Sequence, residues 1–311
     1  MTISAILSLG QTSLELGLIE ALTVLALFLS YSMLNVCDLS TDGCFTLGAA
    51  VGAVVAVAGH PYLSLPAAML AGVVSGFVTA LLQTRMGINS LLAGIIVNTA
   101  LFSINIAVMG GVSLVNLNRA DTVFSILNKL TKGTVWHDYY KLLIAGAAVV
   151  LVIVFLRFFL QTKLGLSIRA TGDNPDMVRS SSINTAFTTM VGLCISNSFT
   201  ALSGCLLAQY NKMANIDIGS GIVTIALASL LMGGVFLGRG GIVKRAIGAV
   251  LGSVLFQLVY AIALRFNMPT FMLKAVSAVI IIFAIGGPYM KKQLPLLVRR
   301  MNAMKGGRNH G

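Results

Sequence analysis

The sequence is poor in charged residues. Asp, Glu, Lys and Arg make up only 10% of its 311 residues, whereas hydrophobic residues make up 57% and the mean hydropathy is +0.93. A soluble domain carries about 25% charged residues, so this composition excludes both a water-soluble globular protein and a disordered chain. It predicts an all-α, polytopic helical membrane protein.

The sequence also lacks the short motifs of several enzyme classes. It has no Gly-x-x-x-x-Gly-Lys-Ser/Thr loop for nucleotide phosphates, no His-Glu-x-x-His pair and no Gly-x-Ser-x-Gly elbow. We therefore expect no catalytic residue, no metal site and no cofactor on this chain; if ATP drives the protein, another subunit binds it. The four cysteines fall in or beside apolar runs, where small buried residues are expected rather than disulfides.

Apolar runs long enough to cross a hydrocarbon core of about 30 Å recur along the whole chain. They predict a single transmembrane domain over 1–311 with roughly eight to ten spans. Nine candidates lie at about 14–36, 44–59, 65–83, 88–111, 141–160, 186–209, 219–237, 244–263 and 271–288. The second run is short and the seventh is rich in Gly and Ser, so at least one of them is expected to be broken or re-entrant.

The basic residues indicate the orientation of these spans. Placing alternate loops on one side of the membrane gathers 14 of the 21 Lys and Arg residues there, and cytoplasmic loops carry the excess of positive charge. This predicts an external N-terminus and a cytoplasmic basic tail at about 289–311. The net charge of +12 is then explained by membrane topology, with no need for a nucleic-acid partner.

A few polar residues lie inside the apolar runs, where ionisable groups are costly. Glu15 and Glu20 fall near the external interface, where a solvated or snorkelling side chain is at least as plausible as a functional one. Asp38 and Asp42 flank a polar interruption before the second span, which is either a tight turn or a break that lines a cavity. The hypothesis that this region lines the translocation path covers six residues: Asn35, Asp38, Ser40, Asp42, Asn98 and Asn197.

Pairs of glycines spaced by four residues recur in the spans. They are Gly48 with Gly52, Gly72 with Gly76, and Gly248 with Gly252. Such pairs let helix backbones approach closely. They therefore predict tightly packed seams, with a moving interface as the alternative.

The longest loop on the predicted cytoplasmic side covers about 164–185. Asn174, Pro175 and Asp176 have the pattern of a helix start: an N-cap side chain, a proline at the first position and a carboxylate at the positive end of the dipole. The pattern predicts a short amphipathic helix over 175–182 that displays Arg179. Such a helix is suited to docking into another protein.

The same loop carries a resemblance to a known family. Residues 169–184 read RATGDNPDMVRSSSIN and resemble the cytoplasmic coupling segment of permease subunits in the branched-chain amino acid and ribose class of ATP-binding-cassette importers. Asp38-Leu-Ser with Gly43 and Gly48, and the Gly-rich run 231–241, resemble two further motifs of that family. Within the class, the chain looks most like permeases for tryptophan, tyrosine or related amino acids.

The resemblance implies a permease that imports a small polar solute, an amino acid by the class it resembles, in a bacterial plasma membrane. It implies a second permease copy as a homodimer in the bilayer, an external substrate-binding protein and separate cytoplasmic ATPase subunits that hold ATP and Mg. The coupling positions carried over are Arg169, Gly172, Asp173, Asn174, Pro175, Asp176, Arg179 and Asn184. An ion-coupled secondary transporter and an intramembrane enzyme are the alternatives.

Overall fold

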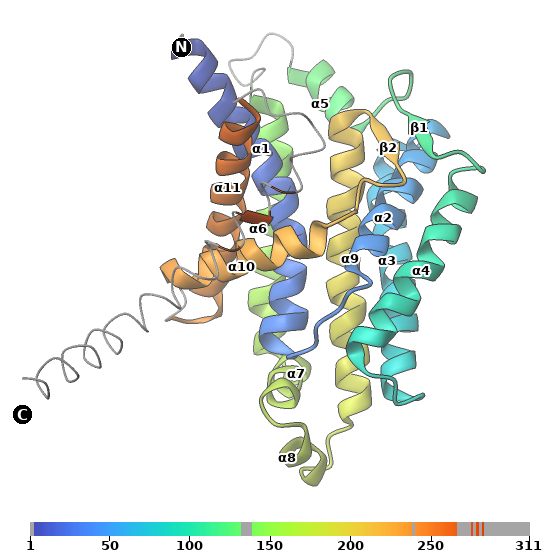
Figure 1. Ribbon diagram of the computed structural model, residues 1–311, viewed down its shortest axis with the longest axis vertical. Coiled ribbons are helices and arrows are strands. Elements are labelled where there is room, and N and C mark those ends of the chain that lie inside the picture. The colour runs from blue at the N-terminus through green and yellow to red at the C-terminus, as the bar shows by residue number, and fades with distance from the viewer. Residues whose placement is uncertain are drawn as a thin grey trace, which may run out of the picture.

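The computed structural model describes residues 3–131, 139–237 and 240–265, together with 275, 278, 279 and 282. These residues form one helical bundle with loops and short elements at its two ends (Figure 1). The helices are α1 (Ile3–Leu27), η1 (Phe28–Met33), α2 (Thr41–Val57), α3 (Pro61–Thr84), α4 (Ser90–Val108), α5 (Val123–Thr131), α6 (Tyr140–Gln161), α7 (Lys163–Asp173), α8 (Pro175–Ser180), α9 (Thr185–Asn211), α10 (Ile222–Leu237) and α11 (Ile242–Arg265). The strands are β1 (Leu114–Asn116) and β2 (Met213–Asn215).

The predicted polytopic helical fold is confirmed. Six of the described helical segments are long and apolar enough to cross a membrane, and α2 and α10 are shorter apolar helices. The boundaries of seven predicted spans agree with the helices to within a few residues; the first span, predicted over 14–36, instead begins at Ile3 and ends at Met33. The ninth predicted span (271–288) and the basic tail (289–311) lie largely outside the described residues.

The first span does not run directly into the second. The last turns before Met33 form the π-helix η1, and Asn35 then takes a left-handed backbone conformation with φ of 56°, which Asn tolerates better than most residues. The chain continues without regular structure until α2 begins at Thr41. The predicted interruption is therefore real, and it is an irregular segment rather than a tight turn between two complete spans.

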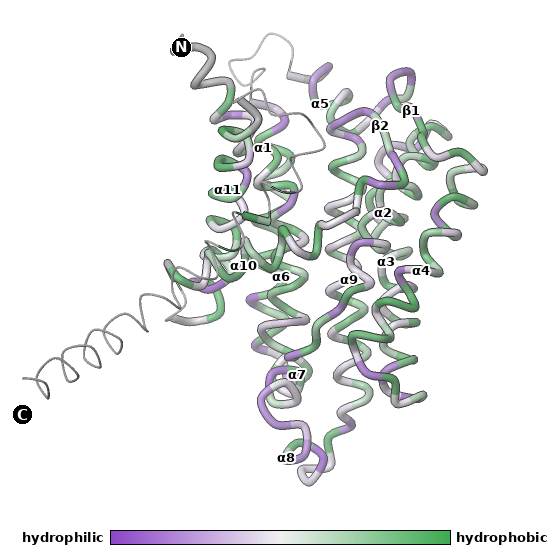
Figure 2. The backbone as a smooth tube through the Cα atoms, viewed as in Figure 1, coloured by the Kyte–Doolittle hydropathy of each residue, from purple (hydrophilic) through white to green (hydrophobic). Residues whose placement is uncertain are grey.

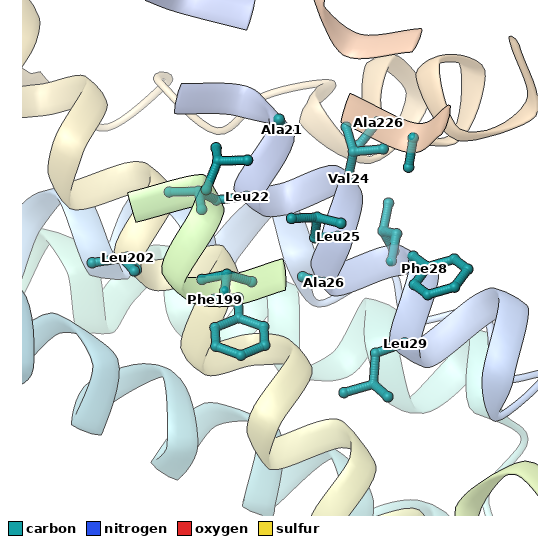
Figure 3. Close-up of a cluster of buried hydrophobic side chains, with 14 of the residues drawn as sticks. Ala21, Leu22, Val24, Leu25, Ala26, Phe28, Leu29, Phe199, Leu202 and Ala226 are labelled. Atoms are coloured by element: carbon teal, nitrogen blue, oxygen red, sulfur yellow. The ribbon is translucent and has the colours of Figure 1, made fainter. Parts of the chain in front are cut away.

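Helix α9 is the centre of the bundle. In its most apolar stretch of 18 residues, 78% of the residues are buried, and α9 packs against α1, α2 and α3. Figure 3 shows side chains of α1 and η1, among them Leu25 and Phe28, beside Phe199 and Leu202 of α9 and Ala226 of α10. The predicted glycine seams are confirmed. A Cβ atom on Gly48 would overlap the carbonyl oxygen of Ala201, and one on Gly72 that of Asn197, so only glycine permits these helix contacts.

Hydrophilic residues gather toward the two ends of the bundle, and hydrophobic residues predominate along the helices between them (Figure 2). At one end β1 pairs antiparallel with β2, so that Val115 faces Ala214, and α5 lies at the same end. At the other end, α7 and α8 project below α6 and α9 (Figure 1). Helix α10 differs from the long helices because it lies across the axis of the bundle.

The two glutamates of α1 are not solvated or snorkelling, as the sequence had allowed. Glu15 is only 4% exposed, and its carboxylate accepts hydrogen bonds from Tyr210 Oη (2.8 Å) and Gln11 Nε2 (3.1 Å). Glu20 is 9% exposed and interacts with Gln257 of α11. Both side chains turn toward neighbouring helices because polar groups on those helices compensate part of the cost of burial.

Candidate functional site: a broken span and a projecting helical hairpin

Asp38 lies at the centre of a buried hydrogen-bond network in the break between η1 and α2. Its Oδ1 accepts from Ser40 N (2.8 Å) and Ser40 Oγ (2.6 Å), and its Oδ2 accepts from Asn197 Nδ2 (3.0 Å). Asp38 is 1% exposed and Asn197 is completely buried. The network therefore ties the irregular segment to the central helix α9.

A second set of contacts extends this network to α3 and to the rest of α9. Thr79 Oγ1 of α3 donates to Ser40 Oγ (3.2 Å), and Cys44 Sγ donates to Asn197 O (3.3 Å). The sequence analysis missed Thr79, because nothing local distinguishes it from the many hydroxyl residues of the spans. Only the packing of α3 against α2 brings it to the network.

Asp42 has a different role from Asp38. Its Oδ2 accepts from Gly221 N (3.0 Å) and its Oδ1 from Val223 N (2.8 Å), so one carboxylate binds two backbone amides where α10 begins. Amides at a helix N-terminus have no partner within the helix and carry partial positive charge. The carboxylate of α2 thus fixes the start of α10 inside the bundle.

The six predicted path residues do not form one cluster. Asp38, Ser40 and Asn197 contact one another. Asp42 lies in the first turn of α2 and binds the start of α10 instead. Asn98 of α4 is half-buried and faces Gly43, where Asn105 Nδ2 donates to the Gly43 carbonyl (3.1 Å). Asn35 is exposed. In this conformation the Asp38 carboxylate is enclosed by its partners, and the path hypothesis stays a prediction.

The network predicts how Asp38 variants behave. Asp38→Asn is expected to keep uptake within about threefold, because Asn197 Oδ1 is buried without a hydrogen-bond partner and an amide flip of Asn197 lets it accept from the new side chain. Asp38→Ala is expected to lower the yield of folded protein, since it removes the acceptor of three buried donors, and a buried donor left unpaired costs about 1–3 kcal/mol. Uptake and detergent-solubilised yield measure the two effects. Loss of uptake by well-folded Asp38→Asn would instead assign a transport role to the charge itself.

Helix α8 confirms the helix start predicted at Asn174. Asn174 Oδ1 accepts from Met177 N (3.0 Å), Pro175 is the first helical residue, and the helix ends at Ser180, two residues before the predicted end. Asp176 and Arg179 are 87% and 68% exposed, and their charged groups lie 3.6 Å apart. The helix displays both charges at the tip of the projecting hairpin (Figure 1).

The other predicted coupling positions have separate structural roles. Asp173 is exposed at the end of α7, and Asn184 Oδ1 caps α9 by accepting from Phe187 N (3.1 Å). Arg169 is half-buried and lines a cavity with Arg157 of α6. Helix α7 itself, from Lys163, was not predicted.

Gly172 connects the projecting helical hairpin, formed by α7 and α8, to the broken span. A Cβ atom at this position would overlap the carbonyl oxygen of Met33 and lie 2.9 Å from Leu34 Cα, so α7 contacts the end of η1 through backbone atoms. A hydroxyl pair, Thr171 Oγ1 and Thr188 Oγ1 at 2.9 Å, joins α7 to α9. These contacts place α7 directly against the residues that precede Asp38.

Comparison of the sequence with known proteins shows the family of the chain. The model of the family described as "Branched-chain amino acid transport system / permease component" matches residues 11–285. The chain belongs to this family. It is 31% identical over 294 residues to a tyrosine transport system permease protein of Clostridioides difficile, covering 93% of this chain and 96% of that one. No solved structure matches it.

Two further relatives were found. The chain is 28% identical over 280 residues to the uncharacterized protein RP368 of Rickettsia prowazekii, covering 88% of this chain and 95% of that protein. It is 27% identical over 126 residues to the autoinducer 2 import system permease protein LsrC of Escherichia coli, covering 40% of this chain and 36% of that one. The permease family consists of transport subunits, so the chain is a membrane-embedded permease component of an importer and not an enzyme.

Proposed function

We propose that this permease carries an amino acid across a bacterial plasma membrane as one of two identical copies. An external binding protein delivers the solute, and cytoplasmic ATPase subunits, which hold ATP and Mg, supply the energy. The full-length similarity to a permease of a tyrosine transport system supports an amino acid as substrate. Few charged residues lie in the spans, which suits a neutral or zwitterionic solute better than a highly charged one.

The proposed orientation places the α8 end of the bundle in the cytoplasm and the N-terminus outside. Seven basic residues of the described part of the chain lie toward the α8 end: Arg85, Arg157, Lys163, Arg169, Arg179, Lys244 and Arg245. Five belong to the opposite end: Arg119, Lys129, Lys141, Lys212 and Arg265. This distribution supports a cytoplasmic α8.

The observation that carries the coupling proposal is the contact between Gly172 and η1. We infer that the ATPase binds α8 and that closure of the ATPase moves α7 and α8 together. Because α7 contacts Met33 and Leu34 through backbone atoms, this movement shifts the segment that leads to Asp38 and α2. In this proposal the broken span has two positions: one opens the path to the outside and the other opens it to the cytoplasm.

Arg179→Glu tests the docking of α8. The substitution places a second negative charge beside Asp176, and we expect ATP-driven uptake in proteoliposomes to fall at least tenfold while the permease stays folded. Co-purification of the permease with its ATPase measures docking directly. The matched control is Lys129→Glu, because Lys129 is similarly exposed (63%) and also paired to an aspartate, but lies at the other end of the bundle. Normal uptake and co-purification by Arg179→Glu would show that α8 does not couple through this residue.

A substrate panel tests the second half of the proposal. Binding of amino acids, nucleosides and sugars to the partner binding protein, followed by uptake of the tightest ligand through the reconstituted importer, identifies the solute. We expect an amino acid, and tight binding confined to sugars would contradict this.

A further inference from the structure

A cavity of about 490 Å³ lies where α6, α7 and the α10–α11 connection meet. Arg157 and Gln161 of α6 and Arg169 of α7 line one side. The other side consists of residues 240–245, which include Lys244 and Arg245. Four cationic side chains therefore line one cavity, and none of the described residues that line it is acidic.

The described residues provide no counter-charge for this cluster. Their two salt bridges, Lys129 with Asp121 and Arg179 with Asp176, both lie elsewhere. Arg245 is held by neutral groups, since its Nη2 donates to Ser32 Oγ (2.6 Å) and its guanidinium lies over the Phe28 ring at 5.4 Å. The four like charges repel one another, and a bound anion would relieve that repulsion.

The backbone adds to the attraction for an anion. Gly240 and Gly241 lead into α11, whose 24 residues begin at Ile242 in the wall of the cavity. The first amides of a helix have no partner within the helix and point toward its N-terminus, where the dipole favours negative charge. The cavity thus combines guanidinium and ammonium groups with backbone amides, a donor set suited to phosphate oxygens.

The surroundings of the cavity indicate where the phosphate comes from. Phe158, next to Arg157, is 64% exposed on α6, and Ile247 and Leu251 are 43% and 46% exposed on α11. These apolar side chains belong to the membrane-facing surface that begins at the rim of the cavity. An anion bound here therefore has room for hydrocarbon chains beside it.

We propose that this cavity binds the phosphate group of an anionic phospholipid in the leaflet on the α8 side. The lipid joins α6 and α7 to the start of α11 electrostatically, and basic pockets between spans are suited to such headgroups. That this is the cytoplasmic leaflet rests on the proposed orientation; the site itself does not.

The test uses the full-length permease purified in a non-ionic detergent and stripped of lipid, without its ATPase. Native mass spectrometry measures the affinity for dioleoyl phosphatidylglycerol, dioleoyl phosphatidylcholine and inorganic phosphate. We expect phosphatidylglycerol to bind at least tenfold more tightly than phosphatidylcholine. Each neutralised cation should weaken the binding of phosphatidylglycerol about fivefold. We therefore expect R157Q/R169Q to bind this lipid about 25-fold more weakly and K244Q about fivefold more weakly.

The control is Lys163→Gln, which removes an exposed charge from the same end of the bundle but outside the cavity lining, and which should leave lipid affinity unchanged. Size-exclusion profiles show whether each variant is folded. If the double variant R157Q/R169Q is not folded, K244Q alone tests the cavity. Equal affinity for the two lipids, or unchanged phosphatidylglycerol affinity in the variants, would overturn the proposal. Inorganic phosphate binding as tightly as phosphatidylglycerol would show a site for a soluble anion instead. Because no ATPase is present, failure here leaves the transport proposal intact, and loss of ATP-driven uptake leaves the lipid result intact.

Discussion

Replacing Asp42 with alanine is expected to abolish uptake and to reduce the amount of folded permease. The substitution removes the acceptor for the amides of Gly221 and Val223 at the start of α10. An unpaired buried amide costs about 1–3 kcal/mol; Val223 is buried, whereas Asp42 and Gly221 are half-buried, so the loss at Val223 is expected to be the larger. Uptake in proteoliposomes and the melting temperature of the detergent-solubilised protein measure the two effects.

Asp42→Asn separates hydrogen bonding from charge. Asparagine retains one acceptor oxygen, so we expect it to bind one of the two amides and to recover part of the melting temperature. Asp121→Ala is the control for loss of a carboxylate, because Asp121 is 56% exposed and pairs only with Lys129 among the salt bridges of the described residues. If Asp42→Ala were as stable and as active as Asp121→Ala, Asp42 would not hold α10.

Gly172→Ala is expected to separate ATP hydrolysis from transport. The added methyl group would overlap the carbonyl oxygen of Met33, and because this neighbour is backbone it cannot rotate away. Helix α7 must therefore shift from η1 while α8 keeps its displayed charges. We expect the ATPase to bind and to hydrolyse ATP at a rate within about threefold of normal, and uptake per ATP hydrolysed to fall at least tenfold.

Gly146→Ala is the matched control for this substitution. Gly146 lies in α6, and a Cβ atom there meets no heavy atom within 4 Å, so uptake and hydrolysis should both be unchanged. A Gly172→Ala permease with normal uptake per ATP would remove the contact with η1 from the coupling pathway. A variant that no longer bound the ATPase would instead show that the position of α7 controls docking.

The sequence predicted those parts of the fold that depend on nearby residues. The length of apolar runs located eight spans, the Asn174-Pro175 pair located α8, and the glycine spacing identified helix seams. Each of these signals lies within a few residues of the structure that it specifies. The polar break after the first span was also visible, because polar residues interrupt an otherwise apolar run.

The functional contacts of the acidic residues could not be predicted in the same way. Asp42 binds amides about 180 positions further along the chain, and Glu15 binds Tyr210, which lies 195 positions away. Such pairs depend on which helices are neighbours, and hydrophobicity does not specify this. Helix α7 was missed because its run from Lys163 is not apolar enough for a span; the one local signal at its start is Thr162, whose hydroxyl accepts from Gly165 N.

The small sheet at the end opposite α8 restricts how the permease can open there. Strand β1 follows α4 and β2 follows α9, and hydrogen bonds from Leu117 N to Lys212 O (2.9 Å) and from Ile216 N to Ser113 O (3.0 Å) extend the pairing of the two strands. The pairing of the two strands thereby joins the ends of α4 and α9. Separating α4 from α9 on this face would break the pairing of β1 with β2, so we expect any opening there to leave these two helix ends together.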